Sequence, residues 1–148
     1  MDYNTPNSYV PADQQAEVCR SLIAWLSNYD DKPCARLDFE HLNERKGLAL
    51  SVIQGAYKTK RYIDGTYEAQ LQFKIIYRDI PDGESARLDM DEVLNEYGSW
   101  AEIATPPILG DNINFKRLRR DTAAAMFARY ENGAEDHQIL MTLTYEVI

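Results

Sequence analysis

The sequence TYEAQLQFKIIYRDI, residues 66–80, decides the fold of this chain. From Tyr67 to Tyr77 every second residue is apolar or aromatic, and the residues between them are polar except for Ile76. A period of two places the apolar side chains on one face of an extended strand, whereas a helix would spread them around its circumference. About 13 residues at roughly 3.3 Å each give about 40 Å, twice the usual strand length. We therefore expect a long strand that bends or extends past its own core and offers pairing groups to a neighbour.

The length and composition of the chain predict one globular domain. Its 148 residues can bury a core, and 45% apolar and 27% charged residues are typical of a folded protein. No apolar run has the length of a membrane span, and the first ten residues lack the features of a signal peptide. We expect no membrane contact and a soluble protein that stays in the cytoplasm where it is made. Cys19 and Cys34 are then expected to be free thiols.

The charge of the chain bears on its partners. With 16 basic and 24 acidic residues, the net charge is −8. Contacts with phosphate groups need clustered positive charge, so this balance argues against general nucleic-acid binding and predicts no direct sequence-specific binding. It leaves room for a local basic patch.

A first helix is predicted over residues 13–28. Its apolar residues recur at spacings of three and four, which is the pattern of a helix with one buried face. Val18, Trp25 and Tyr29 widen this stripe beyond what one sheet would cover. We expect one face of the helix on the sheet and its flank against another element.

A second helix is predicted over residues 89–103. Asp89 and Glu92 resemble a capping box at its start, and apolar residues follow at helical spacing. Gly98 lies beside this apolar stripe and costs about 1 kcal/mol relative to alanine in a helix. A close approach of the helix backbone to the sheet is the simplest reason for a glycine there.

Three further strands and two turns complete the predicted domain. The strands are expected over residues 47–55, 123–130 and 138–147, with a loop over residues 56–65 and a polar arm over residues 1–12. The dipeptides Asp64-Gly65 and Asn132-Gly133 are hairpin signals. Residues 13–148 are thus predicted to form an α+β domain, with an antiparallel or mixed sheet of about four to five strands and two helices packed on one face.

No motif in the chain indicates catalysis or a cofactor. The glycine-rich nucleotide loops, the nucleophile elbow, HExxH and CxxC are all absent from the sequence. With only His41 and His137, a histidine triad or a multi-histidine metal site is not expected. The run Glu135-Asp136-His137 is interpreted as a polar turn leading into a strand, because adjacent residues there would point apart. We predict no enzyme, and no catalytic, cofactor or metal residue.

Two basic segments are the candidate contact sites. One is the cluster at residues 116–120, and the other is the predicted loop at residues 56–65. Their basic residues are Lys116, Arg117, Arg119, Arg120, Lys58, Lys60 and Arg61. In a strand, Lys116 and Arg120 would share one side, and Arg117 and Arg119 the other. The cluster can defend a sheet edge against pairing, contact an acidic neighbouring subunit, or contact nucleic acid.

Three segments carry a resemblance to a known family. YIDGTYEAQLQFKIIYRD, LNEYGSWAE and ENGAEDHQILMTLTYEV are similar to small minor capsid or tail proteins of tailed phages that infect Gram-positive bacteria. The resemblance extends over most of residues 13–148 and points to the tail terminator group. It implies a ring, typically hexameric, that caps the head-proximal end of the tail tube and joins it to the head. The implied partners are further copies of the chain, the tail tube protein and the head–tail connector protein.

The same resemblance implies a virion protein at the tail or the head–tail junction, assembled in the host bacterial cytoplasm. It supplies no catalytic residue. Other roles remain open at this point: a head–tail joining or neck protein, a minor capsid protein, a tube-type subunit, or an adaptor module unrelated to phage. In a ring, two different surfaces of each subunit must be complementary. We predict that residues 116–120 and residues 56–65 project toward neighbouring subunits or tail partners.

Overall fold

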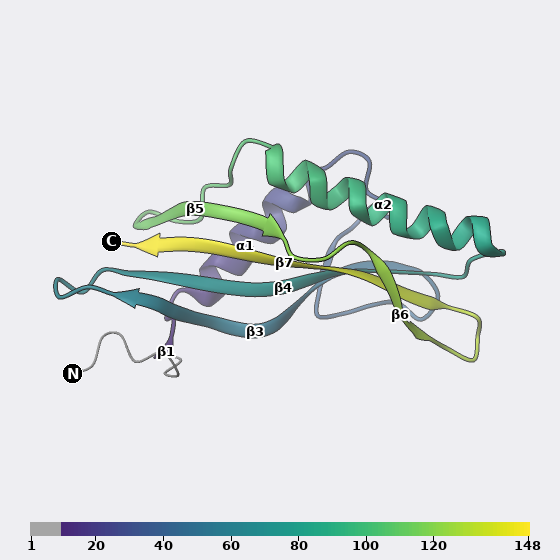
Figure 1. Cartoon of the computed structure of the whole chain (residues 1–148), viewed down its shortest axis with the longest axis horizontal. Helices are drawn as coiled ribbons and strands as arrows, with labels where there is room; N and C mark the ends of the chain where they lie inside the picture. The colour runs from purple at the N-terminus through teal and green to yellow at the C-terminus, as the bar shows by residue number, and fades with distance from the viewer. Residues whose placement is uncertain (1–9) are drawn as a thin grey trace.

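The computed structural model describes residues 10–148, which form two helices and one open sheet (Figure 1). The helices are α1 (Gln15–Leu26) and α2 (Glu84–Ile103). The strands are β1 (Val10–Pro11), β2 (Asp38–Phe39), β3 (Gly47–Arg61), β4 (Tyr67–Asp79), β5 (Ile113–Arg120), β6 (Ala125–Arg129) and β7 (Glu135–Val147). The main path of the sheet is β1-β3-β4-β7-β5, while β2 pairs with β3 and β6 pairs with β7.

The predicted α+β class is confirmed, but the predicted strand count is too low. The sheet has seven strands within residues 10–148, and all pairs are antiparallel except the parallel pair of β2 with β3. The strands β1 and β2 have two residues each, so they carry no periodic pattern that sequence reasoning could detect. β1 also shows that the end of the predicted arm pairs with β3; residues 1–9 of that arm lie outside the described residues.

The long strand at the centre of the sheet is confirmed. β4 pairs along its whole length with β7, from Tyr67 opposite Val147 to Asp79 opposite Glu135. Its alternate residues from Tyr67 to Tyr77 are buried, and those between them are half-buried except Ile76, which is also buried. One face of β4 therefore belongs to the core, and the other carries the polar residues. We call the second face of the sheet the polar face.

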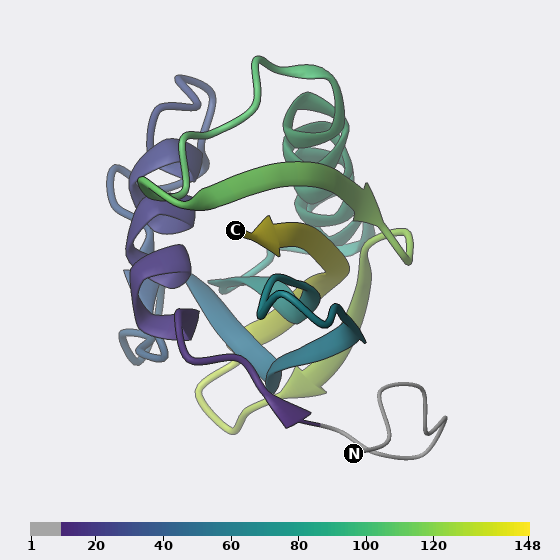
Figure 2. The same ribbon diagram turned by 90° about the vertical axis from the view of Figure 1, so that its left-hand side faces the viewer.

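Both helices pack on the core face of the sheet. Figure 2 shows α1 at the left and α2 at the upper right of the curled sheet. Buried residues of α1 and α2 join strand residues in one continuous cluster, which includes Leu22, Leu26, Leu94, Tyr97, Phe73, Ile75, Met141 and Leu143. Burying such large apolar side chains contributes about 1.5–3 kcal/mol each.

The wide stripe of the first helix has the predicted second partner, which is α2. The rings of Trp25 and Trp100 stack with their centroids 5.0 Å apart, and those of Tyr29 and Tyr97 with theirs 4.8 Å apart. The hydroxyl of Tyr97 donates to the carbonyl oxygen of Leu26 at 2.5 Å. The aromatic residues thus hold the two helices together, and each such ring pair contributes about 1 kcal/mol beyond its buried area.

The second helix begins earlier than predicted. It starts at Glu84, directly after Gly83, which has φ +91° and ends the preceding turn. Asp89 is therefore inside the helix, and the predicted capping box is wrong. Gly98 does permit a close approach, as expected. A Cβ atom there would lie 2.9 Å from Cδ of Arg120 and 3.0 Å from Cδ1 of Ile139.

The predicted loop over residues 56–65 is mostly strand. β3 continues to Arg61 because its pairing with β4 resumes after each register shift between Val52 and Lys60. The turn itself is as predicted, with Gly65 at φ +92° and the carboxylate of Asp64 accepting from the backbone N–H of Thr66. Figure 1 shows this turn at the left end of the molecule, beyond the end of β7.

Both cysteines are free thiols, as expected, with Cys19 buried on α1. Within residues 10–148, neither helix combines the length and apolar character that a membrane crossing requires.

Candidate functional site

The hairpin of β3 and β4 carries one of the two predicted basic groups. Lys58, Lys60 and Arg61 lie opposite Ala69, Glu68 and Tyr67 in the last paired positions before the turn. The ammonium group of Lys58 lies over the ring of Tyr67, 4.3 Å from its centroid. Lys60 is exposed. We call residues 58–66 the basic hairpin, because three cations stand there against the single carboxylate of Asp64.

The second basic group lies on β5, at the edge of the sheet. β5 pairs only with β7, so its other side has no neighbouring strand within residues 10–148. Lys116, Arg117 and Arg119 are exposed there. This position agrees with the interpretation of the cluster as an edge-strand defence, in which charge discourages unwanted pairing. It is equally accessible to a neighbouring subunit.

A bulge changes the predicted sides of these residues. The register of β5 against β7 shifts between Phe115 and Arg117, so Lys116 is an extra residue in the strand. Its ammonium group lies 3.5 Å from the carboxylate of Glu146, which is on the polar face. The prediction that Lys116 and Arg120 share a side is therefore wrong. Lys116 joins Arg117 and Arg119 on the polar face.

The two basic groups are the ends of one row across the polar face. Lys60 on β3 faces Glu68 on β4, Glu68 faces Glu146 on β7, and Glu146 contacts Lys116 on β5. Two glutamates directly opposite one another repel, and the flanking lysines offset this repulsion. The charges of Lys60 and Lys116, at the two ends of the row, are thus partly neutralised within the same chain. Arg117 has no ion pair within residues 10–148, whereas Arg119 pairs with Asp121 at 2.8 Å.

Arg120 is separate from this row. It lies opposite Met141 on the core face of β5, and its guanidinium donates to the backbone carbonyl oxygen of Asn95 at 2.8 Å. Its aliphatic chain packs against Gly98 of α2. Arg120 thus fastens the edge strand to α2, and the structure does not group it with the other predicted contact residues.

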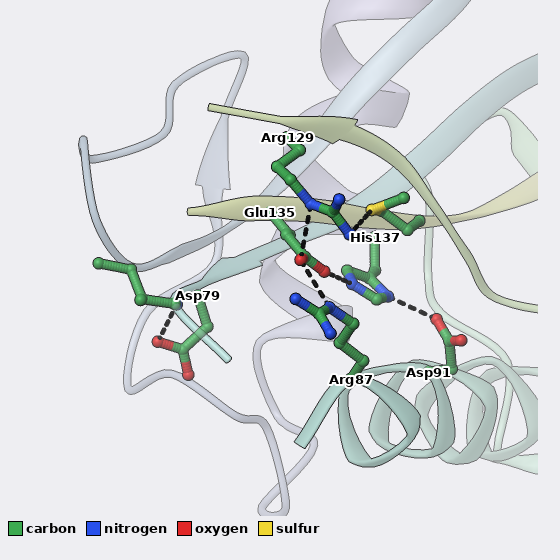
Figure 3. A network of polar contacts seen from close by, with 8 residues as sticks. Asp79, Arg87, Asp91, Arg129, Glu135 and His137 are labelled. Carbon is green, nitrogen blue, oxygen red and sulfur yellow. Dashed lines mark hydrogen bonds and ion pairs between the residues drawn. The ribbon is translucent and has the colours of Figure 1, made fainter. Parts of the chain in front are cut away.

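A buried polar network at the start of β7 was missed by the sequence analysis (Figure 3). The carboxylate of Glu135 accepts from Nε of Arg87 at 2.7 Å and from Nε of Arg129 at 3.0 Å. The imidazole of His137 lies between two carboxylates, with Nδ1 2.6 Å from Asp91 and Nε2 3.1 Å from Glu135. Figure 3 shows the side chains of Glu135 and His137 directed toward α2. We call these five residues the β7–α2 network.

Two of the ionisable side chains in this network are buried. The side chains of Glu135 and His137 are 1% and 2% exposed, respectively. Burial raises the pKa of Glu135, but hydrogen bonds from Arg87, His137 and Arg129 outweigh burial and hold this pKa below its ordinary value.

Asp136 faces the opposite side of the sheet. Its carboxylate accepts two bonds from the guanidinium of Arg78, at 2.6 and 2.8 Å, and one from the hydroxyl of Tyr130 at 2.7 Å. The ring of Tyr130 also lies under Arg78, 4.6 Å from its Cζ atom. This fork-shaped pair joins β4 and β7 on the polar face.

The interpretation of Glu135-Asp136-His137 as a polar turn is therefore wrong. The three residues are strand residues, and they are buried because their partners come from α2, β4 and β6. Adjacent residues do point apart, as expected, but Glu135 and His137 then share one side of the strand and both reach α2. The β7–α2 network brings carboxylates, arginines and a histidine together, but these groups are paired with one another. The pairing ties α2 and the hairpin of β6 and β7 to the sheet. Within residues 10–148, no three His, Cys, Asp or Glu side chains are arranged so that they could hold a metal ion.

Comparison with known proteins assigns this chain to no family. No protein-family model matches the chain, and a search of curated proteins finds no match.

Proposed function

We propose that this chain is a structural protein of a tailed phage, of the tail terminator type, which forms a ring at the head-proximal end of the tail tube and joins the tube to the head. The single observation that carries the proposal is the hairpin of β3 and β4. It reaches past the end of β7 and carries three basic residues on a chain whose net charge is −8 (Figure 1). Together with the resemblance of residues 62–79, it supports a subunit that binds copies of itself.

The distribution of charge favours contacts between unlike surfaces. An acidic chain repels its own copies unless a basic surface of one copy meets an acidic surface of the next. The hairpin and β5 supply the basic surfaces. Contacts between two different surfaces generate closed rings when the rotation between subunits returns to its start. A terminator has to close in this way, since an open series would continue to grow.

Electron microscopy of the purified protein in negative stain tests this proposal. We expect closed rings of one size, with six subunits, whose mass is checked by light scattering. Long tubes formed by the protein alone would contradict a terminator and indicate a tube subunit. Monomers at every concentration tested would contradict a ring-forming protein.

The basic edge strand gives a second expected result. The double substitution Arg117→Glu and Arg119→Glu should weaken the assembly while the monomer remains folded, because both side chains are exposed and outside the core. Light scattering measures the mass of the assembly, and circular dichroism measures the fold. An assembly of unchanged mass would exclude β5 from the interface and leave it as a charged sheet edge.

A further inference from the structure

The tip of the basic hairpin exposes apolar side chains as well as charge. Ile63 is 93% exposed and Tyr62 is 43% exposed. An isoleucine exposed to water at the end of a projecting hairpin does not add to the stability of its own chain. The same residue, three positions after Lys60 at the tip of the basic hairpin, is suited to be an apolar interface anchor with a polar rim.

A groove along α2 has the opposite charge. It has a volume of about 950 Å³, and its apolar surface includes Leu88, Trp100 and Ile103. Leu88 and Ile103 are 68% and 85% exposed, at the two ends of the groove. Glu92 and Glu96 line it between them and take part in no ion pair within residues 10–148.

The helix that forms this groove is acidic over its whole length. Residues 84–103 contain six carboxylates, on Glu84, Asp89, Asp91, Glu92, Glu96 and Glu102, against the one cation of Arg87. Asp91 is bound to His137 and Glu102 to the backbone N–H of Arg120, so those two are engaged. Arg120 also lines the groove, with its guanidinium bound to the carbonyl oxygen of Asn95, so the groove presents apolar contacts at both ends and a net negative charge between them.

The hairpin cannot fill the groove of its own chain. Figure 1 shows the turn of β3 and β4 at one end of the long axis and the start of α2 at the other. A hairpin that points away from the groove reaches an equivalent groove only on another copy. The contact joins two different surfaces, so it has the head-to-tail form that a ring needs.

We propose that the basic hairpin of one copy docks into the acidic groove on α2 of the next copy, with Ile63 and Tyr62 as apolar anchors and the exposed Lys60 facing Glu92 and Glu96, while Lys58 on the other face of the hairpin adds to its positive charge. This inference rests on the proposed function, since it names the two surfaces that build the ring. Both surfaces belong to one chain and complement each other in charge and in apolar character.

Charge exchange tests the contact by sedimentation velocity over a range of protein concentrations. The variants Lys58→Glu with Lys60→Glu, and Glu92→Lys with Glu96→Lys, should each weaken self-association by about tenfold or more, since each sets like charges against one another. One chain that carries all four substitutions should regain association, because the two surfaces are then complementary again. Ile63→Asp should weaken association in the same way without altering the basic residues.

The matched control is Arg45→Glu with Lys46→Glu. It makes the same change in net charge directly before β3, where both residues are exposed and Lys46 lies 3.6 Å from Asp79 much as Lys60 lies opposite Glu68, and it should leave association unchanged. Circular dichroism verifies that every variant remains folded. If the hairpin variant assembles like the wild type, or the four-fold variant does not regain association, the hairpin–groove contact is wrong and the ring proposal stands. If the wild type itself remains monomeric, both proposals are wrong.

Discussion

Replacing Phe73 by alanine is expected to lower the free energy of unfolding by about 4 kcal/mol. Phe73 is fully buried on β4, opposite Val52 of β3 and Met141 of β7. Its removal takes away a large apolar side chain from the middle of the sheet and leaves a cavity that neighbouring strands cannot close. Urea denaturation followed by circular dichroism measures the loss, at one fixed protein concentration because assembly also adds to stability.

The matched control for this substitution is Gln72→Ala, one residue away on the polar face. Gln72 is half-buried opposite Gln54 and Thr142, so its truncation should change the free energy of unfolding by about 0.5 kcal/mol or less. This large difference in the loss of unfolding free energy between two adjacent residues is what a strand with one buried and one polar face predicts. Similar effects at Phe73 and Gln72 would show that β4 does not have one core face and one polar face.

Replacing Glu135 by glutamine is expected to cost about 3 kcal/mol at neutral pH. The substitution keeps the shape of the side chain and removes its charge. Arg87 and Arg129 then face each other and His137 without the carboxylate that binds all three. The cost is less than that of a fully buried network, because the side chains of Arg87 and Arg129 are 38% and 56% exposed. Urea denaturation measures it.

We also predict that the loss of stability in the Glu135→Gln variant depends on pH. The pKa of Glu135 is lower in the folded protein than its ordinary value of 4.5. A carboxylate of this kind stabilises the fold fully above its unfolded pKa, and the contribution is lost as the pH falls through the lower, folded pKa. The difference in stability between the wild type and the Glu135→Gln variant should therefore be constant from about pH 7 to about pH 5 and shrink below the ordinary carboxyl pKa.

The control for this series is Glu131→Gln in the exposed loop before β7. Glu131 forms no ion pair within residues 10–148, so its substitution should leave both the stability and its pH dependence nearly unchanged. A difference between wild type and Glu135→Gln that does not change with pH would mean that the charge of Glu135 is not what stabilises the β7–α2 network.

The candidate contact sites were partly predictable from the sequence. The basic character of residues 58–61 and 116–120 is visible in the chain, and the glycine signal at Gly65 located the hairpin turn. The side of the sheet on which Lys116 lies was not predictable. A bulge depends on the register against β7, which strict alternation along β5 cannot reveal. The groove on α2 was not visible either, since α2 begins five residues before its predicted start at Asp89.

The sequence by itself determined the elements whose pattern is local. The alternation from Tyr67 to Tyr77, the apolar stripes of both helices and the glycine of the hairpin each depend on residues a few positions apart, so they can be seen in one stretch of chain. Only the tertiary structure decided that Glu135 and His137 are buried charges. Their partners Arg87 and Asp91 are 48 and 46 residues away, and a charge is buried only where folding brings its partner to it.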